Sequence, residues 1–173
     1  MTVHDFDERL AFSHSQSDAP WWGEVYRKAF PTLTAVIDVR DDGWAQRGGI
    51  DRLIVLNDGT ALKVDEKVRT VAYPDILLER WSDKARRKPG WMQKELTCDF
   101  VAYAFVPTAV CYLLPWQLLR RAWIENGREW IASCRLVEAQ NRGYVTESVA
   151  VPIQRLLDAV RDAMVVSWTR AAA

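Results

Sequence analysis

A short turn between two strand-like stretches constrains the fold of this 173-residue chain more than any other feature. Residues 50–56 are mostly Val, Leu and Ile, residues 61–69 carry apolar side chains at 62, 64 and 68, and the sequence Asn-Asp-Gly lies between the two segments at 57–59. Two such segments joined by these turn residues predict a β-hairpin. A sheet therefore forms around this part of the chain, and the turn determines how its two strands align.

The length of the turn decides which residues face one another. A three-residue loop with Gly59 in the left-handed conformation places Asp51 opposite Asp65. Because side chains alternate between the faces of a strand, Lys67 then lies on the same face as Asp65. The other face is apolar and is predicted to be core, with Ile50, Ile54, Leu56, Leu62 and Val64.

A two-residue turn would give a different alignment. It would place Asp51 opposite Glu66 and send Lys67 to the other face. It would also set core-facing Ile54 against Lys63, and for that reason we favour the three-residue loop. The sequence alone leaves both alignments open.

Two carboxylates that face each other on neighbouring strands repel unless a cation lies between them. Oxygen ligands without histidine or thiolate suit a hard ion, and Mg²⁺ characteristically binds one or two carboxylates together with waters and substrate phosphate oxygens. We therefore expect Asp51 and Asp65 to bind Mg²⁺, with Mn²⁺ as a substitute. Lys67 would orient or help deprotonate an attacking water and offset charge on the phosphoryl oxygens. The alternative is that these are solvated strand-end charges.

The residues that carry this chemistry resemble a known motif. Ile50-Asp51, a hairpin of about this length, and then Asp65-Glu66-Lys67 are similar to the PD-(D/E)XK nuclease superfamily. By this resemblance Asp51 and Asp65 would be the metal-binding acids, the backbone carbonyl of Glu66 a further ligand, and Lys67 the catalytic lysine. Ile50 stands where the motif has proline, which is a mild departure.

The order of predicted elements indicates an α/β (α+β) protein with a mixed central β-sheet flanked by helices. The resemblance implies a restriction-endonuclease-like fold, whose helix, mixed sheet, helix and strand are similar to the order expected here from 21 to about 133. We expect one domain, made of a polar N-terminal arm (1–18), a nuclease-like core (19–133) and a C-terminal strand and helix (134–173). The predicted elements are a helix at 18–30, strands at 32–39, 50–56, 61–69, 75–79, 97–105 and 109–114, a helix from Pro115, a strand at 144–151 and a helix from Pro152.

Several polar residues are candidates for binding a nucleic-acid backbone. Some precede the glycines that lead to Asp51, one follows Lys67 on the same predicted face, and others belong to the basic run at 83–90. Ordinary surface polarity or a surface salt bridge explains each of them about as well. The candidates are Gln46, Arg47, Arg69, Arg86, Arg87 and Lys88.

Composition excludes several other kinds of chemistry. The only histidines, His4 and His14, lie in the polar arm, which argues against histidine-based catalysis and histidine–zinc sites. Three cysteines without a CxxC pair indicate neither a disulfide framework nor a zinc site. Because the first residues are acidic where a signal peptide would be basic, we expect a cytoplasmic protein.

The charge balance, one long uncharged run and the many tryptophans indicate which partners the chain could have, namely DNA or a membrane. There are 23 basic and 23 acidic residues, so only a local patch could attract DNA. Residues 100–119 carry no charge, but Pro107 and Thr108 divide the run, so two buried strands are expected rather than a membrane span. Nine tryptophans raise the idea of base stacking, although Trp22 and Trp123 fit the core; Trp91, beside the basic run, is the expected exception.

The sequence thus predicts a Mg²⁺-dependent nuclease of PD-(D/E)XK type. It would hydrolyse phosphodiester bonds of DNA by metal-activated water, and the choice of DNA comes from the resemblance. The alternative is a catalytically silent nucleic-acid-binding or regulatory module on the same scaffold. The sequence does not determine the oligomeric state, and a homodimer is one of the options.

Overall fold

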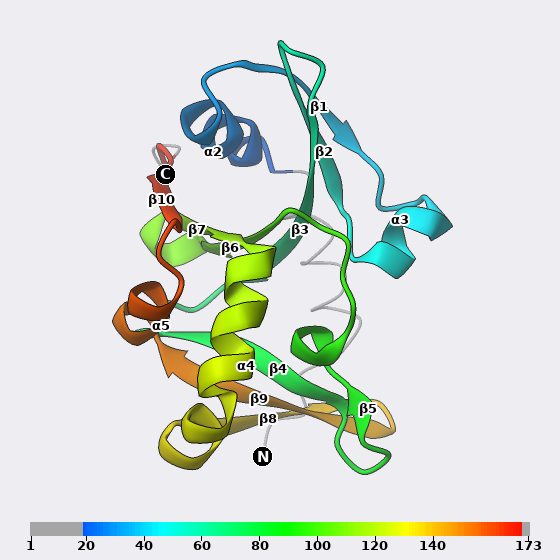
Figure 1. Ribbon diagram of the computed structural model, residues 1–173, viewed down its shortest axis with the longest axis vertical. Coiled ribbons are helices and arrows are strands. Elements are labelled where there is room, and N and C mark those ends of the chain that lie inside the picture. The colour runs from blue at the N-terminus through cyan, green and yellow to red at the C-terminus, as the bar shows by residue number, and fades with distance from the viewer. Residues whose placement is uncertain (1–18, 171–173) are drawn as a thin grey trace. The chain divides into compact units, whose positions relative to one another are not determined.

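The computed structural model describes residues 19–170 (Figure 1), so the predicted polar arm at 1–18 lies outside the described residues. One domain was expected from the length of the chain, and the described residues form two compact units. The first unit contains residues 19–72, 97–114 and 163–170, and the second contains 73–96 and 115–162. Each unit has its own sheet and helices.

The first unit is built on a six-stranded mixed sheet in the order β1-β2-β3-β6-β7-β10. Strands β1, β2 and β3 are antiparallel, β3 and β6 are parallel, and β10 returns antiparallel to β7. The strands are β1 Leu33–Asp38, β2 Arg52–Leu56, β3 Ala61–Arg69, β6 Phe100–Phe105, β7 Val110–Pro115 and β10 Met164–Ser167. This unit also contains helices α2 (Trp21–Ala29) and α3 (Gly43–Gly48) and the short η2 (Val106–Thr108).

The predicted alignment of the hairpin is confirmed. Leu56 N–H donates to the Thr60 carbonyl at 2.8 Å, and Ile54 pairs with Leu62. The three turn residues lie outside the strands, and Gly59 has a φ of 85° in the left-handed region. The two-residue turn is therefore wrong for this protein, and the odd-numbered residues of β3 share one face of the sheet.

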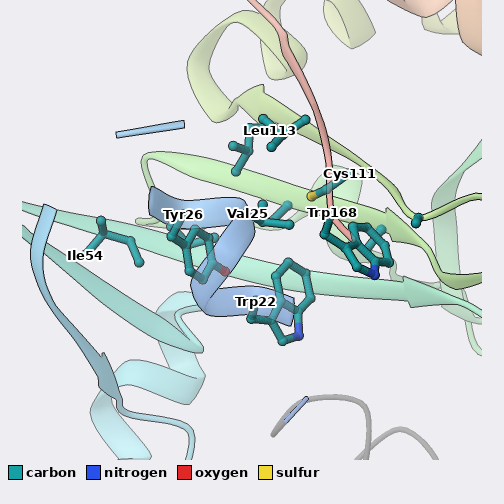
Figure 2. Close-up of a cluster of buried hydrophobic side chains, with 12 residues drawn as sticks. Trp22, Val25, Tyr26, Ile54, Cys111, Leu113 and Trp168 are labelled. Atoms are coloured by element: carbon teal, nitrogen blue, oxygen red, sulfur yellow. The ribbon is translucent and has the colours of Figure 1, made fainter. Parts of the chain in front are cut away.

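Helix α2 covers the other face of this sheet. It begins directly after Pro20, which suits a first helical turn, and ends before Pro31, which cannot continue a helix. Its apolar stripe of Trp22, Val25 and Tyr26 is buried against the sheet, where the cluster also includes Ile54, Val64, Cys111, Leu113 and Trp168 (Figure 2). Full burial of a large apolar side chain contributes about 1.5–3 kcal/mol, so this face anchors β2 and β3.

The second unit is built on a four-stranded antiparallel sheet in the order β5-β4-β9-β8. Pro115 and Pro152 each stand immediately before a helix, as the sequence predicts. The elements are β4 Asp75–Asp83, β5 Lys88–Pro89, η1 Trp91–Gln93, α4 Trp116–Ser133, β8 Arg135–Asn141, β9 Tyr144–Pro152 and α5 Ile153–Ala159.

The mixed α/β class and most of the expected elements are confirmed. The uncharged run forms β6 and β7, separated by η2, and no helix within residues 19–170 is both long and apolar enough to span a bilayer. The strand expected at 75–79 exists as β4, but it belongs to the second sheet, which was not predicted. Strands β8 and β10 and helix α3 were also missed. Helix α3 and β10 are short and give little periodic signal, and the mostly exposed β8 has no regular alternation of apolar and polar residues.

The left-handed turn residue provides a test of the hairpin. Gly59→Ala is expected to lower the free energy of unfolding by about 1 kcal/mol or more, because alanine is strained at this φ although the space around Gly59 is open. Gly43 is the matched control, since its surroundings are also open and its φ is not positive. Urea unfolding followed by circular dichroism should show no loss for Gly43→Ala, and equal losses would contradict the turn geometry.

Candidate metal centre on the hairpin

Helix α3 brings the chain to Asp51. The Asp42 side chain caps this helix by accepting a hydrogen bond from the Trp44 N–H at 2.8 Å, and Gly49 ends it in the left-handed conformation with a φ of 65°. Ile50 is then fully buried and its N–H donates to the Ala45 carbonyl at 3.0 Å. The residue before Asp51 is therefore anchored in the core.

Asp51 lies where the paired residues of β2 and β3 end. Its N–H donates to the Val64 carbonyl at 2.8 Å, and its own carbonyl accepts from the Val39 N–H at 3.0 Å. Its side chain extends the hydrogen bonding between the two strands by one more bond, since Oδ2 accepts from the Glu66 N–H at 2.6 Å. The carboxylate thus takes the place of a backbone acceptor and is held against β3 beside Asp65.

Asp65 is buried between Asp51 and Lys67. Only 4% of Asp65 is exposed, and Oδ1 accepts a hydrogen bond from Lys67 Nζ at 2.6 Å. Burial raises the pKa of Asp65 to about 6; the Lys67 ammonium opposes this shift, and the negative charge of Asp51 adds to it. The three predicted catalytic residues are therefore brought together on one face of the sheet.

The residues at this position fit a hard divalent cation. The buried Oδ2 atom of Asp65 accepts no hydrogen bond, and a buried carboxylate oxygen in this state needs a proton or a cation. Residues 19–170 contain no group of three or more His, Cys, Asp or Glu side chains arranged to hold a metal ion. Two carboxylate side chains are what Mg²⁺ usually requires, because water and substrate oxygens complete its shell. Burial and then the charge of Asp65 raise the pKa of the Cys98 thiol to about 12, so this thiol is protonated in the metal-free protein.

The side chain of Glu66 lies on the opposite face, under α2. Its Oε1 atom accepts hydrogen bonds from Tyr26 Oη at 2.7 Å and from Arg52 Nε at 3.2 Å. Burial is the main reason that the pKa of Glu66 rises to about 7, and the Tyr26 hydrogen bond and Arg52 oppose the shift. The side chain of Glu66 is therefore not part of the metal centre, and only its backbone carbonyl remains a predicted ligand.

Tyr26 and Arg52 were missed in the sequence. Tyr26 fits the apolar stripe of α2, and nothing in that pattern indicates that its hydroxyl has an acidic partner 40 residues away. Arg52 gave a usable signal, since it shares a strand face with core-facing Ile54. An inward-facing arginine requires a buried acid, and Glu66 is the acid on the same face of β3.

Three of the residues proposed to bind a nucleic-acid backbone belong to the first unit, two on helix α3 just before the hairpin and one on β3. Gln46 and Arg47 are exposed on α3. Arg69 shares the sheet face of Lys67, as expected, and its guanidinium donates to Tyr103 Oη at 3.2 Å and lies 6.0 Å from the centre of the Phe105 ring.

The remaining basic candidates belong to the second unit. Arg86, Arg87 and Lys88 lie at the turn between β4 and β5 and at the start of β5. Arg86 pairs with Asp83 at 2.8 Å, and Lys84 pairs with Glu138 and Glu147. The basic run is therefore partly neutralised within its own unit, which favours a structural role for Lys84 and Arg86.

Comparisons with known proteins give no relative. No family model, no curated protein and no solved structure matches the chain. What the fold and the site define is an α/β protein that carries an acidic pair and a lysine on one face of a mixed sheet.

The raised pKa of Asp65 predicts a pH dependence of stability in the presence of EDTA. The Asp65 carboxyl binds its proton more tightly in the folded protein than in the unfolded chain. Its contribution to the free energy of unfolding is therefore fully present below about pH 4 and is lost as the pH rises through about 6. Two pKa units correspond to about 3 kcal/mol. Asp65→Asn should remove this part of the decline, measured as the difference in unfolding free energy from wild type between pH 4 and pH 7.

Asp58 in the same hairpin is the control for that experiment. Its pKa is lowered because its carboxylate accepts a hydrogen bond from the Thr60 N–H, so its contribution to stability is present above its unfolded pKa and is lost as the pH falls. Between pH 4 and pH 7 Asp58→Asn should therefore differ from wild type by a nearly constant amount, and this difference should shrink only below about pH 4. The same trend for both variants would contradict the buried state of Asp65.

Proposed function

We propose that this protein is a Mg²⁺-dependent nuclease that hydrolyses phosphodiester bonds of DNA at Asp51, Asp65 and Lys67. The observation that carries the proposal is the position of Asp65. One of its oxygens is bound by the Lys67 ammonium at 2.6 Å, and the other is buried without a hydrogen-bond donor next to a second carboxylate. A divalent cation removes this conflict, and phosphate oxygens complete its shell.

Asp51 and Asp65 would hold Mg²⁺, or Mn²⁺ in its place, together with the predicted carbonyl of Glu66. When bound, the ion supplies Lewis-acid polarisation of the phosphodiester. Asp51 is pre-positioned for this by the Glu66 N–H, and Asp65 by its burial between β2 and β6. Side chains fixed in this way need little reorganisation when substrate arrives.

Lys67 would act on the substrate directly. Its side chain is 30% exposed, whereas that of Asp65 is 6% exposed, so the ammonium is the more accessible of the two groups. Asp65 holds the ammonium in place, where it offsets negative charge on the phosphoryl oxygens and orients the attacking water. The attraction between the ammonium and the phosphoryl oxygens strengthens as the phosphate gains negative charge, so it stabilises the transition state more than the bound substrate.

Backbone contacts would come from the exposed residues around the site. Gln46 and Arg47 on α3 and Arg69 on β3 are the candidates in the first unit. Arg86, Arg87 and Lys88 were the candidates in the second unit, and of these Arg87 and Lys88 are not committed to the ion pair that holds Arg86 to Asp83. We place the protein in the cytoplasm, where its free thiols, Cys98, Cys111 and Cys134, remain reduced.

Cleavage assays test the proposal. Supercoiled plasmid, linear duplex and single-stranded DNA are incubated with Mg²⁺, Mn²⁺ or EDTA. The wild-type protein should cut with either metal and not with EDTA, and Asp65→Asn and Lys67→Met should each reduce the rate by about a hundredfold or more. Lys63→Met is the matched control on the same face of β3 and should stay within about twofold of wild type.

The outcomes separate the two functional classes. Cutting that survives EDTA or both site variants would contradict the proposal and indicate a contaminating nuclease. A gel shift of DNA without cutting under any metal condition would support the catalytically silent binding module instead.

A further inference from the structure

One tryptophan differs from all the others in its exposure. All nine tryptophans lie within the described residues, and only Trp44, at 64%, is an exposed one. Trp91, the expected exception, is half-buried with its ring 6.3 Å from that of Trp116. An indole held in water loses the favourable burial that tryptophan normally gains, which calls for an explanation at the position of Trp44.

Trp44 stands on a rigid element. Helix α3 is capped by Asp42 at one end and by left-handed Gly49 at the other. Close packing fixes the C-terminal end as well, because any side chain at Gly48 would collide with Thr97 Oγ1. The Thr97 N–H donates to the Gly48 carbonyl at 2.9 Å, so this end is tied to the segment that leads into β6. The indole is thus presented by a fixed helix rather than by a loose loop.

The neighbours of Trp44 suit a nucleic acid. Arg47 is exposed three residues further along α3, a spacing that places two side chains on the same helical face. Asp42 contributes a negative charge, but its carboxylate is engaged with backbone N–H groups of the helix. Asp41 is exposed and is the acid that would oppose phosphate binding there. The chain continues from this helix through buried Ile50 directly to the metal centre.

We propose that Trp44 stacks on an unpaired nucleobase of the substrate while Arg47 binds a neighbouring phosphate. The substrate class is then single-stranded DNA or duplex DNA with an unpaired end. This inference rests on the proposed nuclease function and specifies its substrate. A planar indole and a guanidinium are the pair of groups with which proteins bind single strands without reading sequence, since every base has a π-face.

The geometry of stacking requires that the base bound by Trp44 be unpaired. Inside a duplex both faces of a base are covered by its neighbours, so an indole reaches a base face only where the strand is unpaired or the base is taken out of the stack. Loss of Trp44 should therefore weaken single-strand binding much more than duplex binding. Loss of Arg47 should weaken both and reduce the dependence of binding on salt.

Fluorescence anisotropy in EDTA tests the inference without cleavage. The probes are a labelled 15-nucleotide single strand and a labelled duplex closed into a covalent circle, which has neither ends nor unpaired loop bases. Trp44→Ala should weaken binding of the single strand by about tenfold and of the duplex by less than about twofold, and Trp44→Phe should retain most of the affinity. Tyr144→Ala, which removes an exposed aromatic residue of the second unit, should have no effect.

The results distinguish this inference from the proposed function. Equal weakening of both probes, or no weakening by Trp44→Ala, would overturn the stacking role even if the wild-type protein cuts DNA with Mg²⁺. Selective weakening in a protein that cuts no DNA would support the stacking role and overturn the nuclease. Self-association of wild type that Trp44→Ala abolishes, seen by sedimentation without DNA, would mean that the indole is a protein contact and would also overturn the inference.

Discussion

The register of the β2–β3 hairpin determines everything else at the candidate site. Side chains alternate along a strand, so a slip of one residue would exchange the two faces of β3. The three-residue turn with Gly59 in the left-handed conformation fixes this register, and the apolar pairing of Ile54 with Leu62 under α2 reinforces it. Local turn chemistry and burial in the core therefore agree, and their agreement is what brings Asp65 next to Asp51.

Strand β3 carries buried charge on both of its faces. Asp65 and Lys67 lie on one face, and Glu66 lies on the other with Tyr26 and Arg52. Burial raises the pKa of both acids, so ionising them at neutral pH costs stability. On the Glu66 side, Arg52 and Tyr26 supply a cation and a donor to Oε1, while Oε2 is buried without a hydrogen-bond partner, as Asp65 Oδ2 is. The Asp65 side has a lysine and a second acid, which leaves negative charge in excess, and perturbed acids of this kind concentrate at functional sites.

The sequence allowed prediction where local physics decides the outcome. The turn, the hairpin register and the shared face of Asp65 and Lys67 follow from the turn residues and a period of two. The membership of β4 in a second sheet could not be predicted, because the pattern of a strand does not say which strand it pairs with. The contact between Tyr26 and Glu66 joins residues 40 positions apart and depends on how α2 packs. The exposure of Trp44 was hidden for a similar reason, since a six-residue helix has no periodicity that would show which side faces water.

The acidic pair also bears on the choice between catalysis and simple binding. Two carboxylates beside Lys67 reduce the attraction of this surface for phosphate, because opposite charges at short range largely cancel. A module that only binds nucleic acid would gain affinity by losing Asp51 and Asp65, whereas a nuclease needs them to hold a cation that itself attracts phosphate. The hydrogen bond from the Glu66 N–H to Asp51 and the burial of Asp65 keep both acids in place despite their repulsion. An arrangement that maintains such repulsion makes physical sense when a metal ion relieves it, and this favours the catalytic interpretation over the binding one.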